Sequence, residues 1–420
     1  METVVVVVFA LSYVGIAFGT IPPFALDRTG FALLGAIVMV AVGALSVGHA
    51  VHAIDTPTIL LLYALMVVSA QLRLGGFYTW AALRLARRIH GPVGFLLLLM
   101  LAAAGLAAVL TNDIICLAFT PVLCVAALRA GLNPIPFLLG LAMATNIGSA
   151  ATIIGNPQNM LIGQVERLDF ARFLAYCLPP SLLALGAAFG ILVWLYRGRW
   201  RQQAPAATAG AAPAAPAAAA PEHLAEWPEL NRWQTTKGLL VTVALMAMFF
   251  TSVPRELSAI TAAGLLLLSR RMRSKWLLGF VDWHLLTLFC GLFIIIAALA
   301  QTGLPARAVQ ALGGHGLSLH SLFGLTVVSV VLSNLVSNVP ATMLLLKFVD
   351  PARPTEAYVL ALSSTFAGNL ITLGSIANLI VIEQARHFGI EIRFREYARA
   401  GVPVTLASLL LLALWIVIRG

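Results

Sequence analysis

The segment from Leu110 to Gly163 decides the fold prediction, because two short polar strings interrupt sequence that is otherwise apolar. The first string is Thr111-Asn112-Asp113, and the second is Gly155-Asn156-Pro157-Gln158-Asn159. Within the second string, Pro157 lacks a backbone N–H donor and Gly155 permits unusual backbone angles. We therefore expect the polar strings to mark a tight turn and a break in a helix.

The composition around this segment is that of a membrane protein. Of 420 residues, 60% are hydrophobic and only 10% are charged, and the mean hydropathy is +0.96. A soluble domain cannot bury so much apolar surface, so we predict an all-α polytopic membrane protein in a lipid bilayer. The net charge of +10 does not indicate a nucleic-acid partner, because the basic residues stand in short clusters between apolar runs.

The N-terminal apolar run and the four cysteines do not indicate a cleaved leader, a metal site or a disulfide. The first apolar run begins just after Glu2 without a basic region or a cleavage site, so we predict a retained span. The cysteines show no metal or disulfide spacing, lie in apolar segments and are expected to be buried thiols: Cys116, Cys124, Cys177 and Cys290.

The first half of the chain, residues 1–196, predicts five crossings and one hairpin. Basic residues flank both ends of 93–128, so this pair of apolar runs is expected to be a re-entrant hairpin with the first polar string at its tip. The stretch 136–165 predicts a helix that crosses and is broken by the second polar string. The other predicted spans are 3–20, 29–47, 57–75 and 175–196.

Residues 197–236 change character. They contain the Ala/Pro run Ala204–Pro221, which lacks charge and any apolar period suited to packing. This composition predicts a flexible cytoplasmic linker between two halves.

The second half, residues 237–420, repeats the pattern. It predicts a hairpin at 318–348 with Ser337-Asn338-Val339 at its tip, and a broken helix at 357–385 interrupted by Gly374-Ser375-Ile376-Ala377-Asn378. The remaining predicted spans of this half are 237–251, 257–269, 283–302 and 402–418.

The two halves are in register, which indicates an internal duplication. Asp55 and Asp282 each precede the third span of their half, 227 residues apart, and are expected to be helix N-caps. Gly76 and Gly303 end those spans at the same offset. Five crossings, an odd number, make the second half enter from the opposite side, so the repeats are predicted to be inverted.

Basic residues support one orientation. With the linker in the cytoplasm, most Lys and Arg fall in loops on the cytoplasmic side, as the positive-inside rule requires. Both termini are then expected outside, in a multi-pass inner (plasma) membrane protein of bacterial type.

Two tips from opposite faces and two broken helices are expected to meet near the midplane and form a substrate site. Broken helices present positive N-terminal ends to anions, and their freed carbonyls hold cations. Asn112 and Asn338 are the candidate ligands for Na⁺. The alternative is that such amides only stabilise helix contacts. The candidate substrate and ion ligands are Thr111, Asn112, Asp113, Gly155, Asn156, Asn159, Ser337, Asn338, Gly374, Ser375 and Asn378.

Asp113 is the acidic residue placed in the middle of a segment at membrane depth. An unpaired carboxylate there is costly, so Asp113 is expected to exchange a proton or a cation during transport. The alternative is a protonated Asp113 that only hydrogen-bonds to the opposite tip. No cofactor is expected beyond a coupling H⁺ or Na⁺.

These strings resemble the ion transporter superfamily, which includes arsenite efflux permeases of the ArsB type, NhaD-type sodium/proton antiporters and divalent-anion/sodium symporters with citrate carriers. The resemblance covers nearly the whole chain except the linker. It rests on Asn112-Asp113 with Thr120-Pro121, Asn146-Ile147-Gly148-Ser149 through Asn159, Ser333 through Pro340, and Ala367-Gly368-Asn369 through Asn378. It implies two re-entrant hairpins, a homodimeric scaffold and elevator-type movement of the substrate domain.

The residues at the two predicted hairpin tips differ from those of one branch of this superfamily. Carboxylate symporters of this superfamily carry Ser-Asn-Thr at both tips, whereas this chain has Thr111-Asn112-Asp113 and Ser337-Asn338-Val339. The chain therefore resembles the arsenite-permease branch more closely, because that branch has a similar Asn-Asp pair at the position of Asn112-Asp113. The predicted core also lacks an Arg that would clamp a carboxylate.

The sequence favours two transport functions and does not support a third, enzymatic one. The first is a secondary transporter of a small anion or oxyacid, arsenite-like or a small carboxylate, coupled to H⁺ or Na⁺. The second is a Na⁺/H⁺ antiporter. The third, a membrane-embedded enzyme, is not supported, because the sequence shows no metal-ligand cluster, nucleophile with a base, or nucleotide-binding loop.

Overall fold

The computed structural model describes residues 1–19, 26–88, 91–201, 228–269, 272–304, 307, 319 and 321–419. Within these ranges the chain is helical, with one isolated β-bridge between Leu132 and Arg201. Most of the predicted Ala/Pro linker lies outside the described residues. Helix α12 begins at Arg232, inside the segment assigned to the linker, because the Asn231 side chain accepts a hydrogen bond from the backbone N–H of Gln234.

Helices in the first half follow the predicted order. Helices α6 and α7 meet at the first polar string, and α8 and α9 are separated at the second. Short helices α3 and α5, which flank the third span, were not anticipated from the sequence. The helices are α1 (Glu2–Phe18), α2 (Arg28–Ala41), α3 (Val47–Ala53), α4 (Thr56–Leu74), α5 (Phe77–Ala86), α6 (Pro92–Val109), α7 (Asn112–Arg129), α8 (Ile135–Ser149), α9 (Pro157–Val165) and α10 (Phe170–Leu195).

The second half has the same order. Helices α17 and α18 meet at the second tip, and α19 and α20 are separated by a short connection. The elements are α12 (Arg232–Met248), α13 (Arg255–Leu267), α14 (Ser274–Leu278), α15 (Trp283–Gln301), α17 (Leu322–Val336), α18 (Asn338–Leu345), η1 (Leu346–Phe348), α19 (Pro354–Ala367), η2 (Thr372–Gly374), α20 (Ile376–Arg386) and α21 (Phe394–Arg419).

Six of the described helices are long and apolar enough to cross a membrane: α4, α6, α7, α10, α15 and α21. Helices α1, α2, α8 and α17 are apolar but shorter. The chain is thus a multi-pass membrane protein. Length does not separate a crossing helix from an arm of a hairpin, and α6 and α7 are the arms of the predicted first hairpin.

The predicted N-caps at the two third spans are confirmed. Asp55 Oδ1 accepts a hydrogen bond of 2.9 Å from the backbone N–H of Thr58 in α4. Asp282 Oδ1 accepts one of the same length from the N–H of Leu285 in α15. Each carboxylate satisfies a donor that the helix start leaves unpaired and faces the positive end of the helix dipole.

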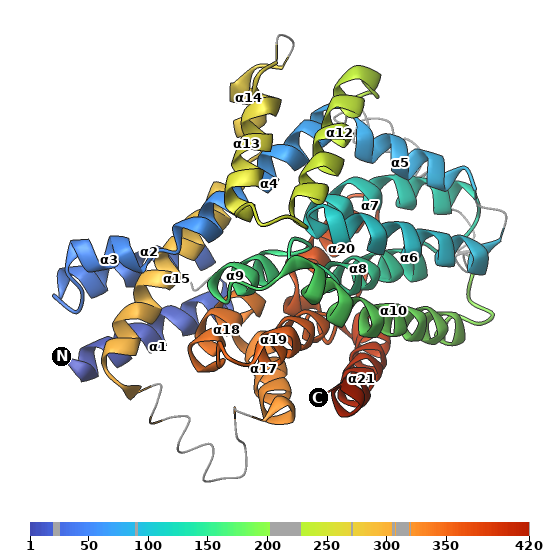
Figure 1. The fold of residues 1–420 in the computed structure, drawn as a ribbon. Helices are drawn as coiled ribbons and strands as arrows, with labels where there is room; N and C mark the ends of the chain where they lie inside the picture. The colour runs from blue at the N-terminus through green and yellow to red at the C-terminus, as the bar shows by residue number, and fades with distance from the viewer. Residues whose placement is uncertain are drawn as a thin grey trace.

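Helices from the two halves interlock (Figure 1). Helix α2 packs against α15, and α4 packs against α13, so each third span lies against the second span of the other half. Helix α7 packs against α20, α9 against α18, and α10 against α21. Within each half, the first arm of the hairpin packs along the first part of the broken helix, α6 on α8 and α17 on α19.

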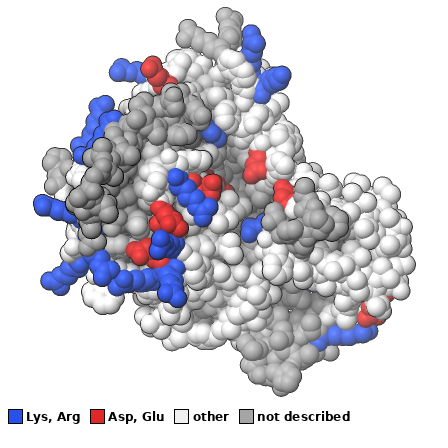
Figure 2. Space-filling model, turned by 180° about the vertical axis from the view of Figure 1, so that it is seen from behind, with Lys and Arg blue, Asp and Glu red and all other residues white. Residues whose placement is uncertain are grey.

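The surface separates charge from apolar side chains. Figure 2 shows most of the Lys and Arg on the left part of the face it presents and a few at its top and right, next to broad surface without charge. Large apolar side chains point outward along α10 and α21, including Leu182, Leu183, Leu410 and Val417. An outer apolar surface of this kind suits lipid contact. Three of the cysteines are buried as predicted, and Cys290 is partly exposed.

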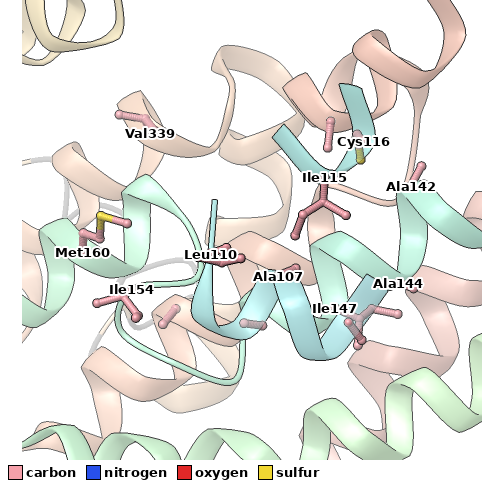
Figure 3. Packing of buried hydrophobic residues seen from close by; sticks show 14 of the residues in the cluster. Ala107, Leu110, Ile115, Cys116, Ala142, Ala144, Ile147, Ile154, Met160 and Val339 are labelled. Carbon is pink, nitrogen blue, oxygen red and sulfur yellow. The ribbon is translucent and has the colours of Figure 1, made fainter. Parts of the chain in front are cut away.

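Close packing around the first hairpin positions its tip. Figure 3 shows Ala107 of α6 and Ile147 of α8 among the buried residues where these helices pack together. A Cβ atom at Gly148 would overlap the backbone of Ala104, so only glycine permits this approach of α8 to α6. Small residues at such a contact let helices in a membrane come close.

Candidate functional site

The two hairpin tips differ in backbone conformation. Thr111 precedes α7 with φ −64° and ψ 125°, an ordinary extended conformation, and its hydroxyl donates to Ser69 Oγ at 3.3 Å. Ser337, between α17 and α18, has φ 77° and ψ 158°. This region is populated almost only by glycine, so the second tip carries backbone strain that the first tip lacks.

The connection between α8 and α9 is held by Asn159. Its Nδ2 donates to the carbonyls of Ser149 at 3.2 Å and Thr152 at 2.9 Å, two groups that the broken helix leaves without helical partners. Asn156 caps α9, because its Oδ1 accepts from the Asn159 N–H at 2.9 Å. A Cβ atom at Gly155 would overlap the Ser149 backbone, so this connection is folded too tightly for a larger residue.

The connection between α19 and α20 is held in the same way by Asn378. Its Nδ2 donates to the carbonyls of Gly368 at 2.7 Å and Ile371 at 3.3 Å. Gly374 lies close to Gly368 in this connection, where an added Cβ would stand 3.0 Å from the Gly368 carbonyl oxygen. In both halves, an asparagine near the start of the second helical part satisfies the carbonyls at the break.

At the second tip, Asn338 contacts the broken helix of its own half. Hydrogen bonding assigns its amide so that the NH₂ group donates to the carbonyls of Ser364 and Gly374, each at 3.2 Å. The side chain is buried. Asn338 therefore joins the second tip to the last turn of α19 and to the end of the connection that follows it.

Asn146 of α8 is the centre of a buried amide network. Its Nδ2 donates to Asn369 Oδ1 at 2.9 Å and to Asn378 Oδ1 at 3.1 Å. Its Oδ1 accepts from Ser375 Oγ at 2.9 Å and from Asn112 Nδ2 at 3.4 Å. Because a primary amide has two donors and two acceptor positions, Asn146 is fully satisfied. It joins the first tip and α8 to the connection of the other half.

Contacts between the two broken helices are reciprocal. Asn156 Nδ2 donates to Thr365 Oγ1 at 3.3 Å, and Ser375 Oγ donates to Asn146 Oδ1 at 2.9 Å. Thr365 follows Asn146 by 219 residues, the same offset that separates Ser375 from Asn156. The residue that precedes the second helical part of each half, Asn156 or Ser375, thus contacts the first helical part of the other half at equivalent positions, Thr365 and Asn146. Gln158 adds a further hydrogen bond to Thr365 at 3.3 Å.

Two atoms of the network lack a partner in the described part of the chain. These are the acceptor Asn112 Oδ1 and the donor Asn369 Nδ2, and both side chains are buried. A buried polar atom without a partner costs about 1–3 kcal/mol, so a ligand that hydrogen-bonds to both would recover that cost. The hydrogen bonds of Asn146 and Thr365 involve only amides and hydroxyls, without a charged side chain.

Asp113 lies directly beside this network, at the start of α7. It is partly buried, and within the described ranges its carboxylate has no hydrogen-bond or ion-pair partner. The positive end of the α7 dipole favours a negative charge at this position. Among the described residues no group of three or more His, Cys, Asp or Glu side chains is arranged to hold a metal ion.

Some of the predicted substrate and ion ligands belong to the amide network, and the others lie in the tips and connections around it. The amide network contains Asn112, Asn156, Ser375 and Asn378. The surrounding tips and connections contain Thr111, Asp113, Gly155, Asn159, Ser337, Asn338 and Gly374.

The sequence alone gives Asn146 no role in the site. From the sequence, Asn369 either allows the close approach of hairpin and helix or contributes directly to the site, and it is not among the candidate ligands. Both occur in strings that carry the family resemblance, Asn146-Ile147-Gly148-Ser149 and Ala367-Gly368-Asn369, and an asparagine inside an apolar helix is the available signal.

Broken helices around a buried polar network, in a chain with many apolar helices, define a membrane transporter. Residues 13–363 match the family model described as citrate transporter, so the chain belongs to the citrate transporter family. This confirms the resemblance to the ion transporter superfamily. The family consists of transporters, and the chain is not an enzyme.

Relatives and a solved structure extend the comparison. The chain is 30% identical over 466 residues to the silicon efflux transporter LSI3 of Oryza sativa subsp. japonica, covering 95% of this chain and 94% of that protein. It is 33% identical over 348 residues to the inner membrane protein YbiR of Escherichia coli K12, covering 82% and 84%. The crystal structure of the Alcanivorax borkumensis YdaH transporter superposes with a TM-score of 0.57 at 17% identity, covering 100% and 98%, so the two share a fold.

Proposed function

We propose that this protein is a secondary active transporter that moves a small anion or oxyacid across the bacterial inner membrane, coupled to H⁺ or Na⁺. The observation that carries the proposal is the amide network centred on Asn146. This network leaves one buried acceptor, Asn112 Oδ1, and one buried donor, Asn369 Nδ2, unsatisfied. A ligand that both donates and accepts hydrogen bonds fits such a site.

An oxyacid fits this site better than a dicarboxylate. An undissociated oxyacid carries hydroxyl groups that donate to Asn112 Oδ1 and oxygen atoms that accept from Asn369 Nδ2. A dicarboxylate brings two negative charges, which a buried site has to compensate with Arg, Lys or bound cations. The hydrogen bonds of the network include no Arg or Lys. The relative named a silicon efflux transporter adds silicic acid to the candidate substrates.

Reciprocal contacts support a chain built from two inverted halves. The pairs Asn156–Thr365 and Ser375–Asn146 relate equivalent positions, as a two-fold axis between the halves would produce. We propose that α1, α2, α4, α12, α13 and α15 form a framework, which pairs with a second copy of the chain. Helices α6–α10 and α17–α21 then form a substrate domain that moves against it as an elevator.

Coupling is assigned to the two tips. Asp113, with an unpartnered carboxylate next to the network, would take up and release the H⁺. A Na⁺ ion would fit at Asn338, where the carbonyl oxygens of Ser364 and Gly374 converge on its amide. If the Asn338 amide turned over, its Oδ1 would become the third oxygen ligand of this Na⁺ ion. At the first tip, Asn112 Oδ1 offers a single oxygen.

The test is flux in proteoliposomes of the purified protein. Arsenite, silicic acid, phosphate, sulfate, succinate, citrate and Na⁺ are offered in turn under imposed pH and sodium gradients. Movement of an oxyacid or carboxylate supports the proposal, and the gradient that drives it identifies the coupling ion. Empty liposomes and the Asn146→Ala variant are the controls.

The second candidate is a Na⁺/H⁺ antiporter, favoured by the single carboxylate of Asp113 beside the network. Sodium/proton exchange without flux of any anion or oxyacid in the same liposomes would support this function instead. Absence of flux for the entire panel would contradict both.

A further inference from the structure

Outside the amide network, Arg255 ties the framework to the substrate domain. It begins α13 and reaches the connection between α9 and α10. Its Nη2 donates to the Gly163 carbonyl and its Nη1 to the Leu168 carbonyl, both at 2.6 Å, and its Nε donates to Gln164 Oε1 at 3.2 Å. Gln164 Nε2 in turn donates to Glu256 Oε2 at 3.0 Å. Each of the three guanidinium nitrogens thus donates one hydrogen bond to the short segment 163–168.

The contact is placed at a helix end that favours a cation. Gly163 is in the last turn of α9, at the negative end of the helix dipole, and its carbonyl also accepts a hydrogen bond from the backbone N–H of Leu168. Helix α9 carries Asn159, which holds the first connection. Helix α13 packs against α4 of the framework. A cavity of about 500 Å³ lies beside the contact and is lined by Arg255, Gln164 and neighbouring residues, so the guanidinium has room to separate from α9.

The same position in the other half has no such contact. Arg28 begins α2 as Arg255 begins α13, and the two stand 227 residues apart, the offset of the N-caps Asp55 and Asp282. Helix α2 packs against α15 as α13 packs against α4. Yet within the described ranges Arg28 has no hydrogen-bond or ion-pair partner.

The residues of the other half that correspond to Glu256 and Gln164 have other partners. Thr29 corresponds to Glu256, and its hydroxyl donates to the His284 carbonyl at 3.2 Å. Glu383 corresponds to Gln164, and it pairs with Arg386 at 3.3 Å. Among the described residues, Arg255 is therefore bound to the end of α9, whereas Arg28 is not bound to the equivalent helix, α20.

We propose that Arg255 and Arg28 are positioning residues that latch the two ends of the transport cycle in turn. In the state described here, Arg255 holds the end of α9. In the opposite state Arg255 releases α9, and Arg28 binds the carbonyls at the end of α20. This inference rests on the proposed elevator with inverted halves. Contacts made in only one state shift the population toward that state.

Cross-linking tests the latch without requiring a known substrate. Two double variants of the full chain in liposomes, Gln164→Cys with Glu256→Cys and Thr29→Cys with Glu383→Cys, are treated with a short bismaleimide. The first pair reports the state described here, and the second reports the opposite state. The chain with only its native cysteines is the control for background reaction.

Arg255→Lys is then added to both double variants. The Gly163 and Leu168 carbonyls remain as acceptors in both double variants. Lysine keeps the charge but lacks the planar fork that donates to these two carbonyls, so the cross-linking ratio should shift roughly tenfold toward the Thr29/Glu383 pair. Arg28→Lys should shift it the opposite way when a gradient populates the opposite state. The elution volume and thermal stability of each variant verify folding.

Two results would overturn the latch: an unchanged ratio in Arg255→Lys, or a Thr29/Glu383 pair that never cross-links in protein whose wild type transports. A ratio that shifts as expected in protein with no flux for any solute would leave the latch standing and remove the proposed function. The two failures are therefore distinguishable.

Discussion

Asn159 and Asn378 hold the two broken helices by the same hydrogen bonds. Each Nδ2 donates to the carbonyls ten and seven residues earlier in the chain, at 3.2 and 2.9 Å for Asn159 and at 2.7 and 3.3 Å for Asn378. Identical spacing shows that the two connections fold alike. Their side-chain oxygens differ, since Asn378 Oδ1 accepts from Asn146, while Asn159 Oδ1 has no partner among the described residues.

Asn146 also makes more side-chain contacts with the other half than its equivalent does. Its equivalent in the other half is Thr365, a shorter side chain with one hydroxyl. Asn146 joins four side chains, whereas Thr365 accepts from Asn156 and Gln158. The unsatisfied atoms that would take a ligand, Asn112 Oδ1 and Asn369 Nδ2, both belong to residues bonded to Asn146.

The first prediction concerns Asn146. Asn146→Ala removes four hydrogen bonds and leaves buried amide groups unpaired, so we expect a loss of stability of about 2–4 kcal/mol and a fall in flux of at least roughly tenfold. Flux in proteoliposomes and thermal unfolding in detergent measure the two effects. Ser363→Ala is the matched control, because its buried hydroxyl bonds only to the Leu360 carbonyl of its own helix. Equal behaviour of both variants would contradict the role of Asn146.

The second prediction concerns strain at Ser337. Ser337→Gly and Ser337→Ala both remove the hydroxyl, but only glycine adopts φ 77° and ψ 158° without steric cost. We expect Ser337→Gly to be more stable than Ser337→Ala by about 1–2 kcal/mol in thermal or denaturant unfolding of the purified protein. Equal stability of the two variants would show that the tip is not strained.

The third prediction concerns Asp113. Asp113→Asn keeps the shape of the side chain and removes its exchangeable charge, so we expect loss of transport driven by a pH gradient, with normal insertion and folding. Flux under an imposed pH gradient tests this, and Glu391→Gln, an exposed carboxylate, is the control. Unchanged proton coupling would leave Asp113 with a structural role only.

The fourth prediction concerns Glu166, which follows α9 at the edge of the membrane-spanning part. Burial, and then the charges of Asp350 and Glu356, raise the pKa of this carboxyl above its ordinary value. The folded protein then binds this proton more readily than the unfolded chain. The cost in stability therefore appears as the pH rises above the ordinary pKa and persists at neutral pH.

We accordingly expect Glu166→Gln to unfold at a higher temperature than the wild type at neutral pH. The difference should shrink as the pH falls below about 4, where the carboxyl is protonated in both states. Thermal unfolding at several pH values measures this. A variant that is less stable than the wild type at neutral pH would show that the charge of Glu166 is favourable in the fold.

Much of the architecture was determined by the sequence alone. Apolar run lengths predict the helices, and the strings at Thr111 and Gly155 predict where helices turn or break, because polar groups and proline cannot continue an apolar helix. Asp55 and Asp282 were predicted as N-caps from their local position, and the structure confirms them. All of these are local properties of the chain.

Only the tertiary structure decided which polar groups meet. Asn146 lies 223 residues from Asn369 and 232 from Asn378, and no local pattern brings them together. No local pattern marks Arg255 as a binding residue, yet its guanidinium binds the end of α9, 92 residues away. Helical periodicity shows which residues favour a helix, but the packing of one helix on another selects the side chains that become partners. The site and the latch depend on that packing, because hydrogen bonds form only where donors and acceptors come within about 3 Å of each other.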